Sequence, residues 1–189
     1  MKVLFIGDIV GKVGRATIKG LLPNIVDRYK IDFVIANGEN VAGGFGVTDK
    51  TAGEILNYGV HVITTGNHIW DKKDSIPYIA KEDRILRPVN YPQGVPGCGS
   101  AVHALSNGTK VGVLNISGRV FMSALDCPFR TGEEEIKKLR ESTDVIIVDF
   151  HAEATSEKIA FGYFVDGKVS AVIGTHTHVQ TAEDRKSVV

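Results

Sequence analysis

Short apolar runs alternate along this 189-residue chain with stretches of helical periodicity. Runs rich in valine, isoleucine and phenylalanine predict buried strands at residues 2–6, 32–36, 60–65, 101–105, 110–116 and 144–150. Helices are predicted around 18–25, 48–59 and 131–141. Strands that alternate with helices indicate an α/β fold.

Helix and turn residues refine this pattern. The first helix has Pro23 as an awkward interior residue, and Thr48 is expected to cap the second. Residues 106–108 (Ser-Asn-Gly) predict a hairpin turn, and a second hairpin is predicted over 161–173. The Pro- and Gly-rich stretch 87–99 is interpreted as a surface excursion, because strand-like sequence resumes at once.

Composition limits the classes of function. The length favours one domain over residues 1–189. The chain has 22 basic and 22 acidic residues, so it has no excess of positive charge with which to bind long nucleic acid. A small phosphate ligand is not excluded, because a bound metal ion can supply positive charge locally. Cys98 and Cys127 lack zinc-ribbon spacing. The N-terminal apolar run stops at Asp8, and no segment approaches membrane-spanning length, so we expect a cytoplasmic protein without membrane partners.

Polar residues whose side chains can act as metal ligands follow five of the strand-like runs. These residues are Asp8, Asn37 to Asn40 with Glu39 among them, Asn67 and His68, His151, and His176 with His178. Because ligands gather at the carboxyl ends of strands in α/β folds, we expect these side chains to converge. Five such placements in one chain predict a binding site.

The side chains have the chemistry of metal ligands. Carboxylate, carboxamide and imidazole groups together suit ions such as Mn, Fe or Zn. Two ions about 3.5–4 Å apart, bridged by a carboxylate, can activate a water and clamp phosphoryl oxygens. Glu39 is the natural bridge, since Asn40 beside it adds a neutral oxygen. His68 adjoins Asn67, and is therefore predicted to act as a proton donor or to stabilise charge.

Several of these residues have simpler explanations when taken singly. Asn67 could cap a helix, and His151 could be a hydrogen-bonded core histidine. Asp71 could orient His68, but a helix cap is favoured. His61 and His103 lie outside the pattern and are interpreted as structural.

The ordered motifs resemble those of the calcineurin-like metallophosphoesterases. They are GD at 7–8, GEN at 38–40, GNH at 66–68, His151 and GTHTH at 174–178. Longer stretches such as ANGENVAGGFG, TTGNHIWDKK and DFHAEATSEKIA are similar to the YmdB-like branch, which contains bacterial cyclic-nucleotide phosphodiesterases. The resemblance covers nearly the whole chain. It implies an α/β metallophosphoesterase-like sandwich of mixed β-sheets flanked by helices.

The resemblance also implies a dinuclear site. Val10 replaces a superfamily histidine, and Asn40 is expected to take its coordination place. One ion would be held by Asp8, Glu39, Asn40 and His178, and the other by Glu39, Asn67, His151 and His176. Fe or Mn is favoured, with Zn or Mg as further candidates. A hydroxide between the ions would attack phosphorus in a small cyclic nucleotide, 2′,3′-cyclic nucleotides being favoured, while His68 serves the leaving group. The residues that bind the nucleotide are not predicted.

The chain ends eleven residues after His178, whereas the family continues with further strands. A C-terminally shortened sheet would expose an edge, so we expect a homo-oligomer. Two alternative functions stay open. One is a regulatory metal-binding protein with little turnover, and the other is a phosphomonoesterase or protein phosphatase.

Overall fold

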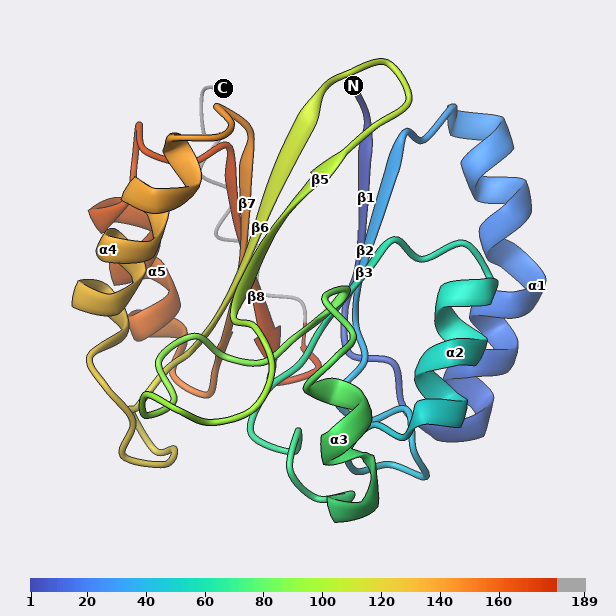
Figure 1. Ribbon diagram of the computed structural model, residues 1–189, viewed down its shortest axis with the longest axis horizontal. Helices are drawn as coiled ribbons and strands as arrows, with labels where there is room; N and C mark the ends of the chain where they lie inside the picture. The colour runs from blue at the N-terminus through green and yellow to red at the C-terminus, as the bar shows by residue number, and fades with distance from the viewer. Residues whose placement is uncertain (180–189) are drawn as a thin grey trace. The chain divides into compact units, whose positions relative to one another are not determined.

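The chain folds into two compact units, each built on one sheet (Figure 1). The structure is a computed structural model that describes residues 1–179. The first unit comprises residues 1–86 and 96–98, and the second comprises 87–95 and residues from 99 onward. One domain over residues 1–189 stays a prediction. No helix in the described part of the chain is long and apolar enough to cross a membrane.

The sheet of the first unit is parallel throughout its described strands. Its order is β1-β2-β3-β4, with bounds Val3–Ile6, Phe33–Asn37, Val62–Thr64 and Ile85–Leu86. The predicted apolar runs explain these strands, because β2 and β3 are buried at every position. In register, Ile6 pairs with Ala36 and Asn37 with Thr64, so the strands end at one edge of the sheet.

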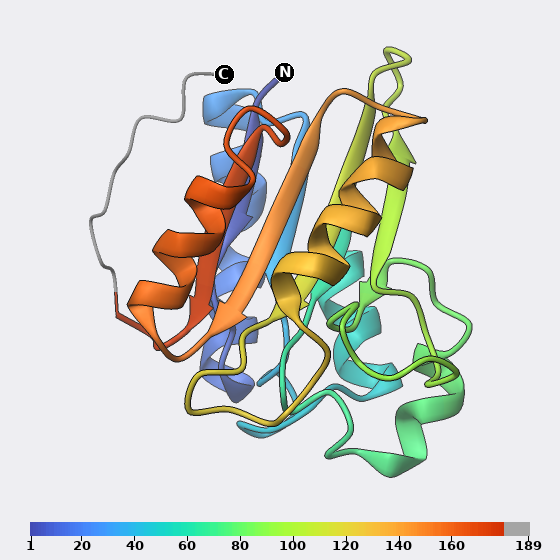
Figure 2. The same ribbon diagram turned by 90° about the vertical axis from the view of Figure 1, so that its left-hand side faces the viewer.

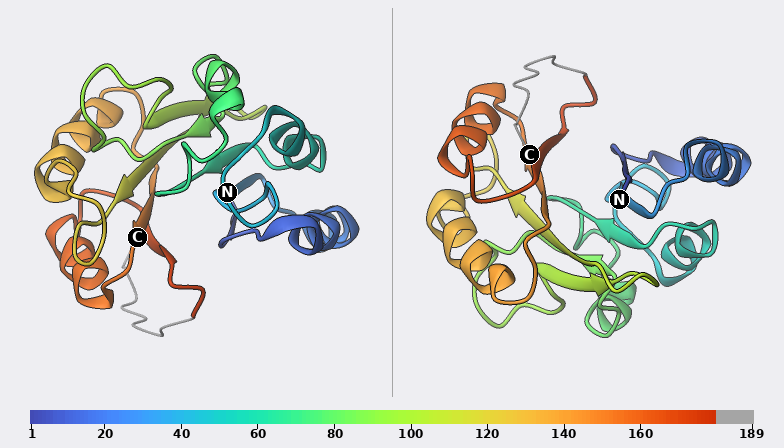
Figure 3. Two further views of the ribbon diagram at one scale, coloured as in Figure 1. Left: turned by 90° about the horizontal axis from the view of Figure 1, so that it is seen from below. Right: turned by 90° about the horizontal axis from the view of Figure 1, so that it is seen from above.

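Two longer helices, α1 (Gly11–Tyr29) and α2 (Asp49–Asn57), lie on the same side of this sheet (Figure 3). Pro23 lies inside α1, as the sequence predicted. The expected cap of α2 is confirmed, because the Thr48 hydroxyl accepts from the Thr51 backbone N–H at 3.1 Å. A short 3-10 turn (Lys73–Ser75) and α3 (Ile76–Ile79) complete the helices of the unit's described residues.

The sheet of the second unit is mixed. Its order is β5-β6-β7-β8, with bounds Ser100–Ala104, Lys110–Ser117, Ile146–Ala152 and Ala171–His176. Only the β5–β6 pair is antiparallel among the described strands. The hairpin predicted at 106–108 joins these two strands, with the Leu105 N–H donating to the Thr109 carbonyl at 2.8 Å.

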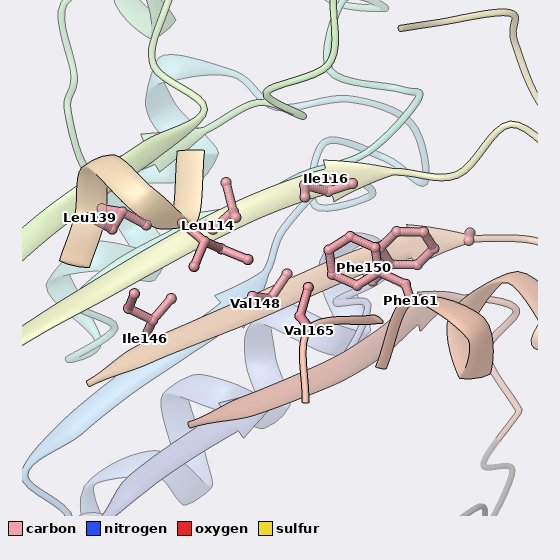
Figure 4. Close-up of a cluster of buried hydrophobic side chains, with 10 residues drawn as sticks. Leu114, Ile116, Leu139, Ile146, Val148, Phe150, Phe161 and Val165 are labelled. Carbon is pink, nitrogen blue, oxygen red and sulfur yellow. The ribbon is translucent and has the colours of Figure 1, made fainter. Parts of the chain in front are cut away.

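Helices α4 (Pro128–Arg140) and α5 (Thr155–Phe164) cover one face of this second sheet (Figure 2). Alternate residues of β7, including Val148 and Phe150, point into the core beneath them (Figure 4). Gly132 lets α4 approach closely, since a Cβ there would lie 2.7 Å from the Ile116 side chain. The intervening β7 positions, Asp149 and His151 among them, therefore point to the opposite face of the sheet.

The hairpin predicted over 161–173 is wrong in its first strand, because residues 161–164 belong to α5. Aromatic residues favour strands in sequence, but Phe161 and Val165 are four residues apart and share one helical face. Both are fully buried in the core, and the Phe161 ring stacks on Phe150 with centroids 4.5 Å apart. Packing on β7 thus outweighs the local preference for a strand.

The irregular stretch 87–95 is organised by one buried amide. Asn90 donates to the carbonyls of Ser117 at 2.8 Å and Asp126 at 3.0 Å, and its Oδ1 accepts from the Ser117 N–H at 2.9 Å. Asn90 thereby fastens this stretch to the carboxyl end of β6.

Candidate metal centre

The candidate ligands of the first unit lie in loops that leave the same edge of its sheet. Asp8 follows β1, Glu39 follows β2 and Asn67 follows β3. The parallel register brings these strand ends together, as expected from the sequence. The loops are also joined by the Ile9 N–H, which donates to the Asn37 carbonyl at 2.9 Å.

Glu39 is a buried carboxylate, with 1% of its surface exposed. Its Oε1 accepts from the side-chain amide of Asn40 at 3.1 Å, and its backbone N–H donates to the Asn37 side chain at 3.1 Å. This hydrogen bond directs the side-chain nitrogen of Asn40 toward the Glu39 carboxylate. A metal ion would supply charge opposite to that of this buried carboxylate.

His68 lies beside this group and is oriented by Asp71. Its Nδ1 is 2.7 Å from the Asp71 Oδ2, and its backbone N–H donates to Glu39 at 3.4 Å. The ring of Phe45 meets the imidazole edge-on, with centroids 5.3 Å apart. Gly46, at φ +74°, makes the return of this loop feasible, since a Cβ would lie 3.1 Å from the His68 carbonyl.

The expectation that Asp71 caps the next helix is wrong. The N-cap of that 3-10 turn is Lys72, which makes no side-chain capping bond. The Asp71 carboxylate accepts a hydrogen bond from His68 instead. Only two residues separate them, and the turn between them brings the two side chains together. Asp71 thus orients His68, which the sequence analysis gave as the less favoured alternative.

The second unit brings two predicted ligands into direct contact. His151 lies within β7 near its carboxyl end, and His176 is the last residue of β8. His151 Nε2 is 3.0 Å from His176 Nδ1, and the rings meet at 73°. His151 is fully buried, while His176 reaches outward to Glu153, with Nε2 3.1 Å from the carboxylate.

The backbone at the end of β8 is unusual. His176 has φ +90° and His178 has φ +53°, values that residues with a side chain rarely adopt. Such positions concentrate at functional sites, where surrounding contacts hold them. His178 is exposed just beyond the strand. The residues from 180 onward lie outside the described residues.

The donor set fits a metal site by its chemistry. Glu39, His151 and His176 each offer a carboxylate oxygen or an imidazole nitrogen of the kind that holds a metal ion. The two histidines interpreted as structural lie elsewhere: His61 accepts the Val34 N–H at 3.0 Å, and His103 lies on β5. Burial lowers the pKa of His61, which favours its neutral, accepting form.

Sequence comparison decides the family. The model of the family described as YmdB-like protein matches residues 4–187. The chain belongs to the YmdB-like family. A 2′,3′-cyclic-nucleotide 2′-phosphodiesterase of Bacillus subtilis (strain 168) is 46% identical over 185 residues, which cover 98% of this chain and 70% of the relative. The family resemblance and the prediction that the chain is an enzyme are thereby confirmed.

Solved structures extend the comparison to the fold. A hypothetical protein from Thermus thermophilus has a TM-score of 0.90 at 42% identity, covering 97% of this chain and 70% of its own. A novel phosphatase from Mycoplasma pneumoniae has a TM-score of 0.88 at 36% identity, covering 96% of this chain and 66% of its own. The α/β fold with two sheets flanked by helices is confirmed. The chain spans 66–70% of the length of these three similar proteins.

Proposed function

We propose that the protein is a metal-dependent phosphodiesterase that hydrolyses 2′,3′-cyclic nucleotides. The observation that carries the proposal is the His151–His176 imidazole pair, 3.0 Å apart between ring nitrogens, in a chain 46% identical to a 2′,3′-cyclic-nucleotide 2′-phosphodiesterase. The buried carboxylate of Glu39 adds a negative ligand of the type that a second cation requires.

The proposed ligands are those expected from the sequence. One ion would be held by Asp8, Glu39, Asn40 and His178, and the other by Glu39, Asn67, His151 and His176. Fe or Mn is proposed, with Zn or Mg as substitutes. When bound, such ions neutralise phosphoryl oxygens and activate water for attack. Glu39 would be the ligand shared by the two ions, and the neighbouring Asn40, whose side-chain nitrogen donates to Glu39, would add a neutral oxygen.

His68 is proposed to serve the leaving group. Because the Asp71 carboxylate can only accept, the Nδ1 of His68 carries its hydrogen and the Nε2 faces away from Asp71. An imidazole held in this way can protonate the departing alkoxide or stabilise its negative charge. Asp71 acts through His68 as a positioning residue.

A phosphomonoesterase is the second candidate, since the Mycoplasma pneumoniae neighbour is described as a novel phosphatase. Both activities need charge neutralisation at phosphorus, and they differ in the substrate that the site admits. The third candidate is a regulatory protein that binds metal with little turnover.

One assay panel separates the three candidates. Purified protein is supplied with Mn²⁺ and assayed on 2′,3′- and 3′,5′-cyclic nucleotides, bis-p-nitrophenyl phosphate and p-nitrophenyl phosphate. We expect the highest kcat/KM on 2′,3′-cyclic nucleotides and loss of activity after chelation. Hydrolysis confined to p-nitrophenyl phosphate would favour the phosphomonoesterase, and metal binding without turnover would favour the regulatory protein.

A homo-oligomer in the cytoplasm stays part of the proposal. Light scattering coupled to size exclusion measures the oligomeric state, and cell fractionation with an antibody to the chain measures the location. Monomeric protein, or recovery from the membrane fraction, would contradict the respective statement.

A further inference from the structure

A chain of hydrogen bonds joins buried side chains of the second sheet and ends at His151. The Thr175 hydroxyl donates to the Asp149 Oδ1 at 2.6 Å, and the Thr175 hydroxyl oxygen lies 2.9 Å from the His151 Nδ1. All three side chains are buried, Asp149 and His151 fully and Thr175 to 4% exposure. Two members of this network, Asp149 and Thr175, are not among the proposed metal ligands.

The sheet register explains why these residues meet. His151 on β7 pairs with Thr175 on β8, so their side chains lie next to each other on one face. Asp149 precedes His151 by two residues on the same strand and points to that face as well. The helices α4 and α5 pack on the opposite face, which leaves this row of polar side chains outside the apolar core.

The direction of the hydrogen bonds fixes the tautomer of His151. A hydroxyl has one hydrogen, and at Thr175 that hydrogen goes to the Asp149 carboxylate. The Thr175 oxygen can therefore only accept from His151, which requires the His151 Nδ1 to carry a hydrogen. A neutral imidazole protonated at Nδ1 has its lone pair at Nε2, the atom that lies 3.0 Å from His176.

We propose that Thr175 is a positioning residue that, backed by Asp149, holds His151 as the Nδ1–H tautomer and so presents Nε2 to the metal. The inference rests on the proposed function, in which His151 is a ligand. Metal-bound histidines commonly donate their other ring N–H to an oxygen, and loss of that oxygen lowers metal affinity about 10–100-fold. Here the accepting oxygen is the Thr175 hydroxyl, and Asp149 sets its orientation.

The first test reads the tautomer without metal or substrate. Protein with ¹⁵N-labelled histidine is freed of metal by chelation, and two-bond ¹H–¹⁵N correlation spectra are recorded at mildly alkaline pH, with His151→Gln assigning the signal. We expect His151 to carry its hydrogen on Nδ1. A hydrogen on Nε2, or on both nitrogens, would overturn the proposal whatever the enzyme assays show.

The second test compares three variants by Mn²⁺ titration. Thr175→Val keeps the shape but removes the hydroxyl, so we expect Mn²⁺ affinity to fall about 10–100-fold and the His151 tautomer to become mixed. Thr175→Ser restores the hydroxyl and should retain both properties even if the valine variant folds poorly. Thr177→Val is the matched control, because the Thr177 hydroxyl contacts Lys158 at 3.1 Å and not a histidine.

The outcomes separate this inference from the proposed function. Nδ1–H in the wild type together with weakened Mn²⁺ binding in Thr175→Val supports the positioning role, even if no cyclic nucleotide is hydrolysed. Unchanged affinity and tautomer in a folded Thr175→Val variant would overturn it, even if the phosphodiesterase activity is established. An affinity loss of equal size in Thr177→Val would also overturn it, because the hydroxyl next to His151 would then have no special role.

Discussion

The Nδ1 of His68 lies 2.7 Å from the Oδ2 of Asp71, so the carboxylate fixes the imidazole within a single turn of backbone. The pair is partly exposed, with side-chain exposures of 31% and 43%, unlike the buried Glu39 nearby. A group of this kind is accessible to a substrate and is oriented by a partner, which are the two properties that a leaving-group acid needs.

Removal of the His68 imidazole should lower turnover and spare metal binding. For His68→Ala we expect kcat to fall about 10²–10⁴-fold, the usual contribution of an acid–base group. The loss should be smaller on nitrophenyl esters, whose leaving groups need little protonation. Steady-state kinetics and elemental analysis measure the two effects, and an equal loss on every substrate together with lost metal would make His68 a ligand.

Asp71 should act only through His68. We expect Asp71→Asn to lower kcat less than His68→Ala does, because the amide can still accept from the Nδ1–H but carries no charge. In a double-mutant cycle, Asp71→Asn should have almost no effect once His68 is alanine. Additive losses in the double variant would assign Asp71 an independent role.

The charge of Glu39 should be essential for metal occupancy. Glu39→Gln keeps the size of the side chain and an oxygen that can accept from Asn40, so the fold should survive. The neutral amide cannot balance two cations, and we expect both metal content and hydrolysis to collapse. Circular dichroism checks the fold and elemental analysis checks the metal; two ions per chain in this variant would exclude the bridging role.

Glu157 should stabilise the loop that follows β6. Its buried carboxylate accepts from the Arg119 N–H at 3.0 Å and the Val120 N–H at 3.1 Å. Hydrogen bonds to a charged group contribute about 1.5–3 kcal/mol, so Glu157→Gln should lower the free energy of unfolding by roughly that amount. Urea denaturation measures it, with the exposed Glu134→Gln as a control that should change it by less than about 0.5 kcal/mol.

His61 should make stability depend on pH. Burial lowers its folded-state pKa below that of the unfolded chain, so the unfolded state binds more protons between the two values. This contribution is fully present above the usual histidine pKa of about 6.5 and is lost as pH falls through the folded value. Urea midpoints on either side of that pH should differ more in the wild type than in His61→Asn, and equal differences would contradict the role of His61.

Local patterns predicted those parts of the fold in which each residue's neighbours are close in sequence. Thr48 caps α2 and the turn at 106–108 joins β5 to β6, because caps and tight turns depend on a few adjacent residues. The strand prediction was wrong at Phe161, since its position depends on stacking against Phe150, eleven residues away in sequence. The apolar composition of that stretch suits either structure.

Candidate site residues at strand ends could be predicted, because carboxyl ends of parallel strands share an edge. His151 was expected just after a strand and lies within β7. Asp149 and Thr175 could not be identified from the sequence, because a single polar residue within a strand has no distinctive spacing. Their contact depends on the register of β7 and β8, which the sequence alone does not specify.

The left-handed backbone at His176 and His178 has a kinetic consequence. Each such residue carries a conformational cost of about 1–3 kcal/mol, which metal ligation of its imidazole would offset in the proposed site. Without metal, the end of β8 should therefore open before the rest of the sheet. The backbone amides of residues 177–179 should then exchange with deuterium faster than those of the strands of this sheet. Binding of a metal would slow that exchange, so deuterium uptake at this one segment would report occupancy of the site without any catalytic turnover.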